Sequence, residues 1–449
     1  MKKLILSLFL LISCLPGFSQ HESLFNLWYG VKWNVNATAP EVIRIAELDS
    51  MNIHRYDVLP IQTAMKGCLL LDNGVVNYYL NPIDWSAKEA GGASKLDGAD
   101  GQVMIEIPSH YELFEQIGDT CYAKICLVYK AGFRYVPKMY VSAYKAALNR
   151  TTLKLASVKN TTATYRGGAN QSTWDALDKT MLGKPVTDVS RTNFRVYAQK
   201  RGVNWSMQNY RTWKTVYWLY IIEYATRNSQ AAVDYTYTAE GYHKGGLGAG
   251  VTNLVSAEWN TYNSLYPIIP CGTSDSLANS TGQKLYVIPG YTGTNTVYVA
   301  RYRGIENAFG EIWDWVDGIN FQFLQTQQTA KAYIIDNPNH FADANVNIGK
   351  ARAVMNVSKT SGYIKSMVFG SYGDVLAVNA GTSGTGSSTY YADYNHSGYA
   401  ASYWGWRALL VGGGYAISDS YAGLGCAHSY YAAWSTYAYL GSRLVFTGN

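Results

Sequence analysis

No catalytic motif is present in this 449-residue sequence. The chain contains no G-x-S-x-G nucleophile elbow, no HExxH zinc motif and no CxxC pair. Its seven histidines are scattered along the whole chain. Asp343 begins a segment that imitates a calcium-binding EF-hand loop, but Ile348 replaces the required glycine and Val354 replaces the required glutamate. The sequence therefore predicts a protein that is not an enzyme and that needs no metal or cofactor.

The chemistry that the sequence favours is recognition by aromatic side chains near the C-terminus. Residues 390–439 contain eleven tyrosines together with Trp404, Trp406 and Trp434, interleaved with small polar residues. Tyrosine and tryptophan offer a large contact area at low rotamer cost, as in antibody paratopes. Some of these rings must belong to a core, but so many hydroxyls cannot all be buried with a partner. We therefore expect a substantial part of them to face outward as a binding surface.

A binding surface needs a rigid support, and residues 301–320 have the composition of one. Burying Trp313 and Trp315 alone would remove several hundred Å² of apolar surface from water. At about 25 cal/mol per Å² this contributes on the order of 5 kcal/mol before entropy is counted. The carboxylates of the segment are Glu306, Glu311, Asp314 and Asp317. Such groups more often cap turns and accept from buried donors than bind a metal, so we predict a fixed framework.

Composition and the first residues indicate a folded, exported protein. Glycine (42) and tyrosine (39) are abundant, a composition that argues against disorder. The net charge of +6 is spread thinly along the chain, which argues against nucleic-acid binding. Residues 1–19 have Lys2 and Lys3 before an apolar run, typical of a signal peptide cleaved near Ser19. Residues 11–14, LISC, also resemble a lipobox, which leaves lipidation of Cys14 as an open alternative. The five other cysteines are too few for a disulfide framework.

Two regions of different character follow the signal segment. Residues 20–160 contain short apolar or alternating runs between turn signals such as DNG at 72–74, and predict a β-rich N-terminal domain. Residues 161–449 begin with a polar, Gly/Asn/Thr-rich stretch. They continue with two predicted helices, one over 190–200 capped by Ser190 and one over 210–230. Short strands and long Gly/Ser/Thr/Tyr-rich loops follow.

Two segments carry a resemblance to a known family. Residues 302–320, YRGIENAFGEIWDWVDGIN, resemble the signature of C-type-lectin-fold proteins of phages and prophages, including tail-fibre and receptor-binding proteins and the variable proteins of diversity-generating retroelements. Residues 407–414, RALLVGGG, and the final LGSRL at 440–444 resemble the family's closing pattern, and the two predicted helices resemble its framework helices. The resemblance covers roughly residues 165–449. It implies an α+β chain with a C-type lectin-like C-terminal domain.

In that family a rigid framework presents side chains from the last fifty or so residues as a variable ligand-binding face. The resemblance implies a non-enzymatic ligand- or receptor-binding protein at the cell surface, a target of a diversity-generating retroelement. The residues that it assigns to the face are Tyr390, Tyr391, Asp393, Tyr394, Asn395, Tyr399, Tyr403, Trp404, Tyr415, Ser418, Asp419, Tyr421, His428, Tyr430, Tyr431, Trp434 and Tyr437.

The resemblance leaves alternatives for function and location. The expected partner is a protein or glycan receptor on a cell or phage surface, with homo-oligomers open and membrane contact only through a lipid anchor. The expected location is the cell surface or the medium, with a virion tail protein as the alternative. Formylglycine-generating enzymes share a segment similar to GEIWDW at 310–315, but they use two neighbouring cysteines, whereas Cys426 has no neighbour in sequence. Catalysis of that type is therefore not expected.

Overall fold

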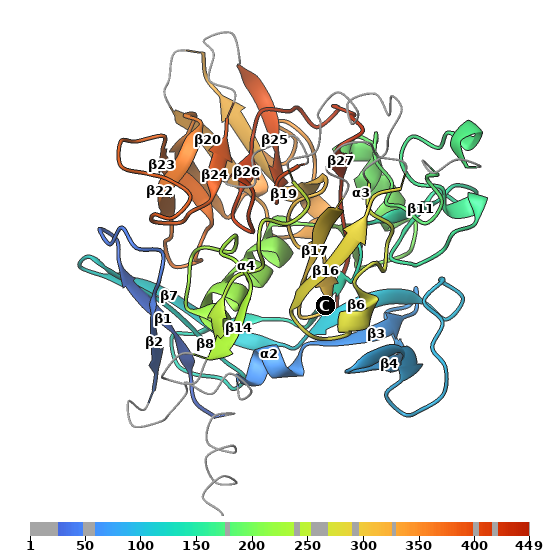
Figure 1. Cartoon of the computed structure of the whole chain (residues 1–449). Helices are drawn as coiled ribbons and strands as arrows, with labels where there is room; N and C mark the ends of the chain where they lie inside the picture. Colours follow the sequence, from blue (N-terminus) through green and yellow to red (C-terminus); the bar gives the residue numbers. More distant parts are fainter. Residues whose placement is uncertain are drawn as a thin grey trace, which may run out of the picture.

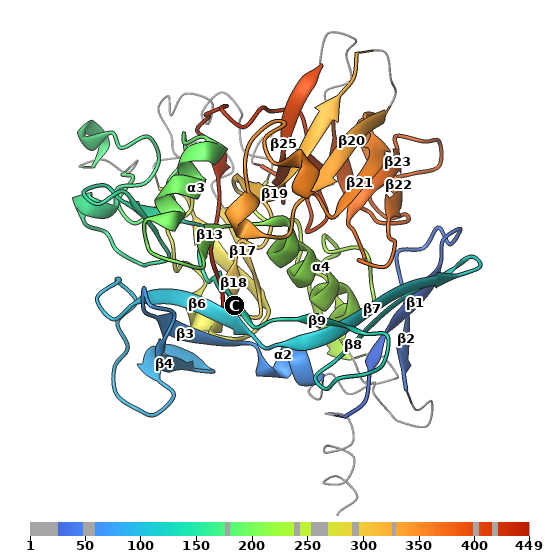
Figure 2. The same cartoon turned by 180° about the vertical axis from the view of Figure 1, so that it is seen from behind.

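The computed structural model describes residues 26–47, 59–175, 180–237, 243–252, 268–289, 296–325, 329–397, 404–414 and 421–448. The described chain is rich in strands, and its two longer helices pack against sheets that are antiparallel at nearly every pairing (Figure 1). Strands of the N-terminal part form the lower layer in this view, and a second large sheet of the C-terminal part lies above it. Helix α4 (Tyr210–Tyr224) lies between the two layers (Figures 1 and 2).

The N-terminal part contains two antiparallel sheets, as the alternating runs predict. The five-stranded sheet has the order β2 (Ile43–Ala46), β1 (Tyr29–Asn34), β8 (Thr120–Cys126), β7 (His110–Ile117) and β9 (Arg134–Val136). The seven-stranded sheet has the order β13 (Trp205–Met207), β28 (Leu444–Thr447), β10 (Met139–Ser142), β6 (Gln102–Ile107), β3 (Lys66–Leu70), β4 (Val76–Asn81) and β5 (Asp84–Lys88). The turn between β3 and β4 contains Gly74 at φ +82°, which a residue with a side chain rarely adopts.

The last strand of the chain lies inside this N-terminal sheet. Strand β28 pairs with β10 on one side and with β13 on the other, so it fills the position between them. The C-terminus accordingly lies beside β6 in Figure 1. The division into domains at 160 stays a prediction, but the two parts share this sheet and the closing residues 440–447 lie where they meet.

Both predicted helices are present. Helix α3 (Arg191–Gln199) begins after Ser190, whose hydroxyl accepts from the backbone N–H of Asn193, as the capping prediction requires. Helix α4 begins at a capping box formed by Asn209 and Thr212. The prediction that it extends to 230 is wrong: it ends at Tyr224, and Ala225 is left-handed at φ 51°.

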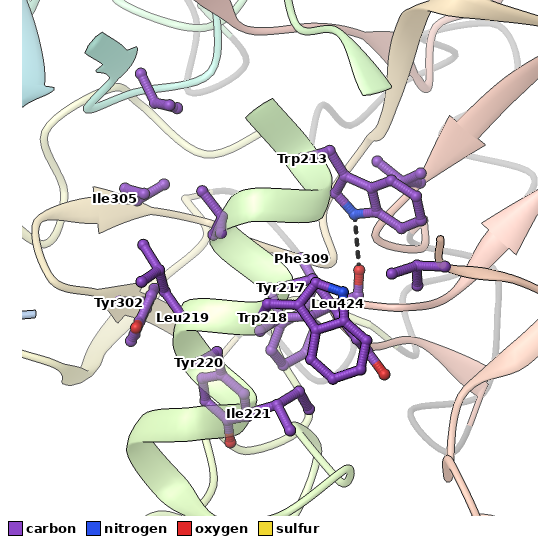
Figure 3. Close-up of a cluster of buried hydrophobic side chains, with 14 of the residues drawn as sticks. Trp213, Tyr217, Trp218, Leu219, Tyr220, Ile221, Tyr302, Ile305, Phe309 and Leu424 are labelled. Carbon is purple, nitrogen blue, oxygen red and sulfur yellow. Dashed lines mark hydrogen bonds between the residues drawn. The ribbon is translucent and has the colours of Figure 1, made fainter. Parts of the chain in front are cut away.

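Helix α4 is buried along its whole length except at Arg211, and most of its side chains are apolar or aromatic. Its tyrosines and tryptophans contact side chains from both layers, among them Tyr302, Ile305 and Phe309 (Figure 3). The Trp213 indole N–H donates to the carbonyl of Leu424 over 2.9 Å. The helix is therefore the core that holds the C-terminal sheet against the N-terminal strands.

The C-terminal sheet positions the tyrosine-rich tail. Its order is β21 (Ala353–Ser358), β20 (Thr329–Ile334), β19 (Trp313–Phe323), β25 (Gly405–Val411), β26 (Ala427–His428), β24 (Tyr394–His396), β22 (Gly362–Val368) and β23 (Leu376–Ala380), with β27 (Leu440–Gly441) also paired to β19. The edge strands β21 and β23 approach one another, so the sheet is nearly closed. Its parallel pairs are β24 with β26 and β19 with β27.

Short elements complete the described chain. The remaining strands are β11 (Ala147–Asn149), β12 (Lys154–Ala156), β14 (Asp234–Tyr237), β15 (His243–Gly245), β16 (Gly282–Val287), β17 (Thr296–Tyr302) and β18 (Ile305–Glu306). The short helices are α2 (Pro60–Ala64) and 3₁₀ turns at Ala163–Tyr165, Ser172–Trp174, Asp275–Leu277, Pro338–His340 and Ile348–Lys350. Among the described residues, no helix combines the length and apolar character needed to cross a membrane.

The segment 301–320 is buried framework, as predicted. Trp313 and Trp315 lie in the core, and the four carboxylates of the segment are all at most 2% exposed. Glu306 accepts from the backbone N–H groups of Gly272 and Ser274 at 2.9 and 2.6 Å. Asp317 accepts two hydrogen bonds from Arg195 at 2.6 and 2.9 Å. These carboxylates therefore hold loops and helix α3 in place.

Asp343, at the start of the segment that imitates an EF-hand, is likewise engaged by protein groups. It accepts from Arg191 Nε at 2.9 Å and from Arg195 Nη2 at 2.8 Å. Burial opposes this charge, but the two guanidiniums outweigh it and hold the pKa of Asp343 below its ordinary value. Within the described residues, no group of three or more His, Cys, Asp or Glu side chains is arranged to hold a metal ion.

Candidate functional site

The tail residues meet on one part of the C-terminal sheet because of how its short strands pair. Strand β24 runs parallel to β26, which places His396 opposite His428, and the two rings stack 5.6 Å apart. Strand β22 pairs with β24 in the opposite direction and places Tyr363 opposite Tyr394, with ring centroids 5.2 Å apart. Residues separated by more than thirty positions in sequence thus become side-by-side aromatic neighbours.

From this centre the rings continue in both directions. Tyr421 lies 4.3 Å from Tyr394 between ring centroids. On the other side, Tyr431 stacks on His428 at 5.1 Å with an interplanar angle of 5°. Tyr437 then packs against Tyr431 at 5.1 Å. We call this series the aromatic row; its members are Tyr363, Tyr394, His396, Tyr421, His428, Tyr430, Tyr431, Tyr437 and Tyr439.

Framework residues support the row from below. Trp313, which is 5% exposed, contacts His396 and His428 edge-on at 5.4 and 5.0 Å between ring centroids. The hydroxyls of Tyr431 and Tyr439 hydrogen-bond to each other over 2.7 Å. Each such aromatic pair contributes about 0.5–1.5 kcal/mol beyond the area it buries. The row is therefore a preorganised surface, held by the segment that the sequence singles out as framework.

The aromatic side chains of the tail differ in how far they are exposed to solvent. Trp434 is 72% exposed, Trp404 63% and Tyr437 40%. Tyr394, Tyr421, His428, Tyr430 and Tyr431 are half-buried, so each offers part of a ring to solvent. The half-buried rings and Tyr437 are in contact with one another and form a surface of the kind that binds through large, rigid aromatic contacts.

Four of the expected face residues lie inside the protein and serve the scaffold: Tyr390, Tyr391, Asp393 and Asn395. The Arg227 guanidinium lies 4.9 Å from the ring centroid of Tyr391. The Asn395 side-chain amide donates to the carbonyl of Thr360 over 2.9 Å. Burial raises the pKa of Asp393 well above its ordinary value, against the lowering effect of the Gly425 N–H that it accepts from.

The remaining expected residues lie outside the described residues. They are Cys14, Tyr399, Tyr403, Tyr415, Ser418 and Asp419.

Sequence reasoning missed Tyr363, His396 and Tyr439 as members of the row, and it assigned Trp313 only a framework role. The Tyr394-x-His396 alternation of a half-buried strand was the available signal for His396. No signal in the sequence places Tyr363 beside Tyr394, because that contact depends on the pairing of β22 with β24.

Both histidines of the row are held neutral. Burial lowers the pKa of His396 to about 4, and the hydrogen bond to the carbonyl of Tyr421 offsets only part of this effect. Burial, followed by the neighbouring His396, lowers the pKa of His428 well below its ordinary value. The Nε2 atom of His396 has no hydrogen-bond partner within the described structure. At neutral pH the row therefore offers uncharged imidazoles among its rings.

The cysteines in the described part of the chain are all free and buried. Cys271 and Cys426 are buried, and burial raises the pKa of both thiols well above the ordinary value. Each donates to a backbone carbonyl: Cys426 to Tyr421 over 2.9 Å and Cys271 to Lys145 over 3.6 Å. A thiol without thiolate character and without access to solvent packs as a small apolar side chain.

Comparison with known proteins yields a neighbour of low similarity. No protein-family profile matches the chain, and no curated protein sequence matches it. Among solved structures, it is similar to the chain titled "Major Tropism Determinant U1 Variant", with 10% sequence identity and a TM-score of 0.21. The similarity covers 76% of this chain and 72% of that chain. A TM-score this low does not establish a shared fold, so the site rests on the contacts described above.

Proposed function

We propose that this chain is a non-enzymatic ligand- or receptor-binding protein, and that the aromatic row with Trp434 is its recognition surface. The observation that carries the proposal is the continuity of the row: its rings lie in contact from Tyr363 to Tyr439, Tyr437 is exposed, and most of the others are half-buried. A tyrosine-rich core without a function would bury its largest rings. Here Trp434, which stands between Tyr431 and Tyr437 in sequence, is 72% exposed, and Tyr437 is 40% exposed.

The chemistry of the row suits a protein or glycan partner. Aromatic faces stack on sugar rings and pack against apolar side chains, and tyrosine hydroxyls add hydrogen bonds at their edges. The imidazoles are neutral, and the row contains no lysine or arginine, so it offers nothing like the basic groove of a nucleic-acid site. No metal or cofactor is needed for recognition of this kind.

We further propose that the face is variable, on a C-type lectin-like scaffold, and that the chain is a target of a diversity-generating retroelement displayed at the cell surface or secreted. The support is the resemblance of residues 302–320 and 407–414 to that family. In addition, Trp313 of the first segment contacts His396 and His428 of the row. A reverse-transcriptase gene beside a near-copy of the last hundred or so bases, differing at adenines, is the expected genomic finding. Uncleaved protein in purified virions would instead favour a tail-fibre role.

The residues to change are Trp434 and Tyr437. Replacing both with serine removes the most exposed ring of the row, Tyr437, together with the exposed indole of Trp434, and loss of an aromatic anchor costs about 2 kcal/mol or more in binding. We expect at least a tenfold weaker affinity for any ligand that the wild-type protein retains on an array of immobilised glycans and bacterial surface proteins. The melting temperature should remain close to that of wild type.

Tyr298 provides the matched control, because it is 53% exposed and lies on β17, away from the row. Tyr298→Ser should bind as wild type does. Unchanged binding by the Trp434/Tyr437 double variant, or an equal loss in Tyr298→Ser, would place the recognition surface elsewhere.

A further inference from the structure

A charged cavity lies beside the first turns of helix α4, where Arg211 and Lys214 line it. Its volume is about 210 Å³, and it is lined by residues of β7, β9, α4 and the loops that precede β21 and β23. By the same measure one water needs about 10–15 Å³, so there is room for a small ligand. The walls come from both the N-terminal and the C-terminal part of the chain.

Four cations line this cavity: Arg134, Arg211, Lys214 and Arg352. Its carboxylates are Glu112 and Asp336, with Asp374 behind Arg352. Arg352 faces two carboxylates, which leave this side with one negative charge in excess: Asp374 accepts two of its hydrogen bonds at 2.6 and 3.1 Å, and Asp336 lies 2.8 Å from its Nε.

The other side of the cavity carries an excess of positive charge. Glu112, which is 5% exposed, serves both Arg134 and Lys214, with Lys214 Nζ 3.2 Å away. One carboxylate thus faces two cations. Lys214 and Arg134 also donate to the carbonyl of Tyr372. This carbonyl occupies hydrogen-bond donors of both cations without adding a negative charge.

Arg211 is the cation with no partner. Throughout the described residues its guanidinium makes neither a hydrogen bond nor an ion pair, although it lines the cavity and is only partly exposed. Burial lowers its pKa, and the more distant Asp336 and Glu112 offset this only in part. The amide groups at the start of α4 are satisfied by the Asn209 capping box, so the helix end is not what attracts an anion here.

Aromatic rings flank the cationic groups. The guanidiniums of Arg134 and Arg352 lie 3.8 and 4.1 Å from the ring centroid of Tyr372, and both are therefore fixed in orientation. Tyr135, which is 53% exposed, lies at the rim and packs against Tyr111. The cavity thus combines an unpaired guanidinium with exposed rings on which a polar, ring-shaped body can rest.

We propose that this cavity binds the anionic group of a small polar molecule, a carboxylate, sulfate or phosphate on a body such as a sugar. Arg211 is the cation that pairs with the anionic group. Lys214 and Arg134 add positive electrostatic potential, because they share the single carboxylate of Glu112. Arg134 and Arg352 are positioned by Tyr372, and Tyr135 covers the ligand body. The site is separate from the aromatic row and does not depend on the proposed function of that row.

The test is isothermal titration of the full mature chain with glucuronate, glucose 6-phosphate and neutral glucose at low ionic strength. We expect glucuronate, glucose 6-phosphate or both to bind, and glucose not to bind. Which of the two anions binds tells whether the cavity recognises a carboxylate or a phosphate. Inorganic sulfate should compete with the bound anion. Arg211→Gln, a substitution that helices tolerate well, should weaken binding at least tenfold without changing the melting temperature.

Lys331→Gln is the matched control, because it removes one exposed positive charge on β20 outside the cavity. Its affinity should equal that of wild type. The proposal is overturned if neither anion binds, if glucose binds as well as glucuronate, or if Arg211→Gln and Lys331→Gln weaken binding equally. If Arg211→Gln failed to fold, sulfate competition on the wild type would still test the proposal. Displacement of the bound anion by sulfate would support an anion site, and no effect of sulfate would show only a solvated ion-pair network.

Discussion

Asp314→Asn is expected to lower the free energy of unfolding by about 3–5 kcal/mol, the usual cost of removing one partner from a buried ion pair. Asp314 Oδ2 lies 2.9 Å from Lys145 Nζ and 3.3 Å from Arg443 Nε, and all three side chains are at most 3% exposed. Asparagine keeps the shape but leaves two buried cations without their carboxylate. Because Lys145 belongs to the N-terminal part, between β10 and β11, and Arg443 to the closing segment, the loss weakens the junction between the two parts.

Glu311 is the group that sets how large this loss is. Burial raises the pKa of Glu311 to about 8, while Lys145 lowers it. The charge of Asp314 also raises the pKa of Glu311, so replacing Asp314 with a neutral side chain should lower that pKa. Urea unfolding followed by tryptophan fluorescence measures the effect. Asp234→Asn is the control, since its exposed pair with Lys244 should contribute little. Equal stability of Asp314→Asn and wild type would contradict a framework role for residues 301–320.

Acid is expected to destabilise the wild-type protein relative to His396→Phe. The folded pKa of His396 is about 4, below the value of about 6.5 for an exposed histidine. Above pH 6.5 neither the folded nor the unfolded state is protonated there, so the histidine contributes no pH dependence. Between pH 6.5 and 4 only the unfolded state takes up the proton, and stability is lost as the pH falls. At 1.36 kcal/mol per pH unit the loss is roughly 3 kcal/mol at most, because the ring keeps some access to water.

The comparison with a variant is necessary because other groups oppose this trend. Glu311 has a raised pKa and therefore gains stability for the folded state as the pH falls from about 8 toward its unfolded value. The measured quantity is the difference in unfolding free energy between wild type and His396→Phe at pH 7 and pH 4. That difference should shift by 1–3 kcal/mol in favour of the variant at pH 4, by the same linkage. A difference independent of pH would show that the imidazole is not held neutral inside the row.

Local sequence signals predicted the local structure well. Ser190 identified the start of α3, the apolar character of residues 210–224 identified α4, and the turn at Gly74 separated two strands. Each of these features depends on neighbours within a few positions. The end of α4 was missed because Ala225, a good helix former, is left-handed where the chain turns to join Pro40 through the N–H of Arg227.

Long-range pairing was beyond prediction. Nothing in the composition of β28 indicates that it fills a place between β10 and β13, more than two hundred residues earlier. The same limit applies to the binding face. The density of tyrosines predicted that aromatic residues would gather, but not that Tyr391 and Asp393 would turn inward while Tyr394 faces the row. Tyr391 and Asp393 precede β24, and only the alternation of half-buried Tyr394 and His396 with buried Asn395 belongs to that strand and its parallel pairing with β26.

The role of the central acidic segment, in contrast, followed from physical chemistry alone. Carboxylates placed among tryptophans must either find buried donors or remain at the surface. Glu306, Asp314 and Asp317 found such donors in Ser274, Lys145 and Arg195. The segment is therefore the support on which the tail rings rest.

Two displayed libraries compare the face with its support. One randomises Tyr430, Trp434 and Tyr437, and the other randomises Trp313 and Trp315; both are scored for protease-resistant folding and then selected on an immobilised protein such as lysozyme. A variable face on a rigid framework should give mostly folded members and target-specific binders in the first library, and few folded members in the second. If the first library loses folding as the second does, or folds but yields no binder, the tail is core rather than a recognition surface.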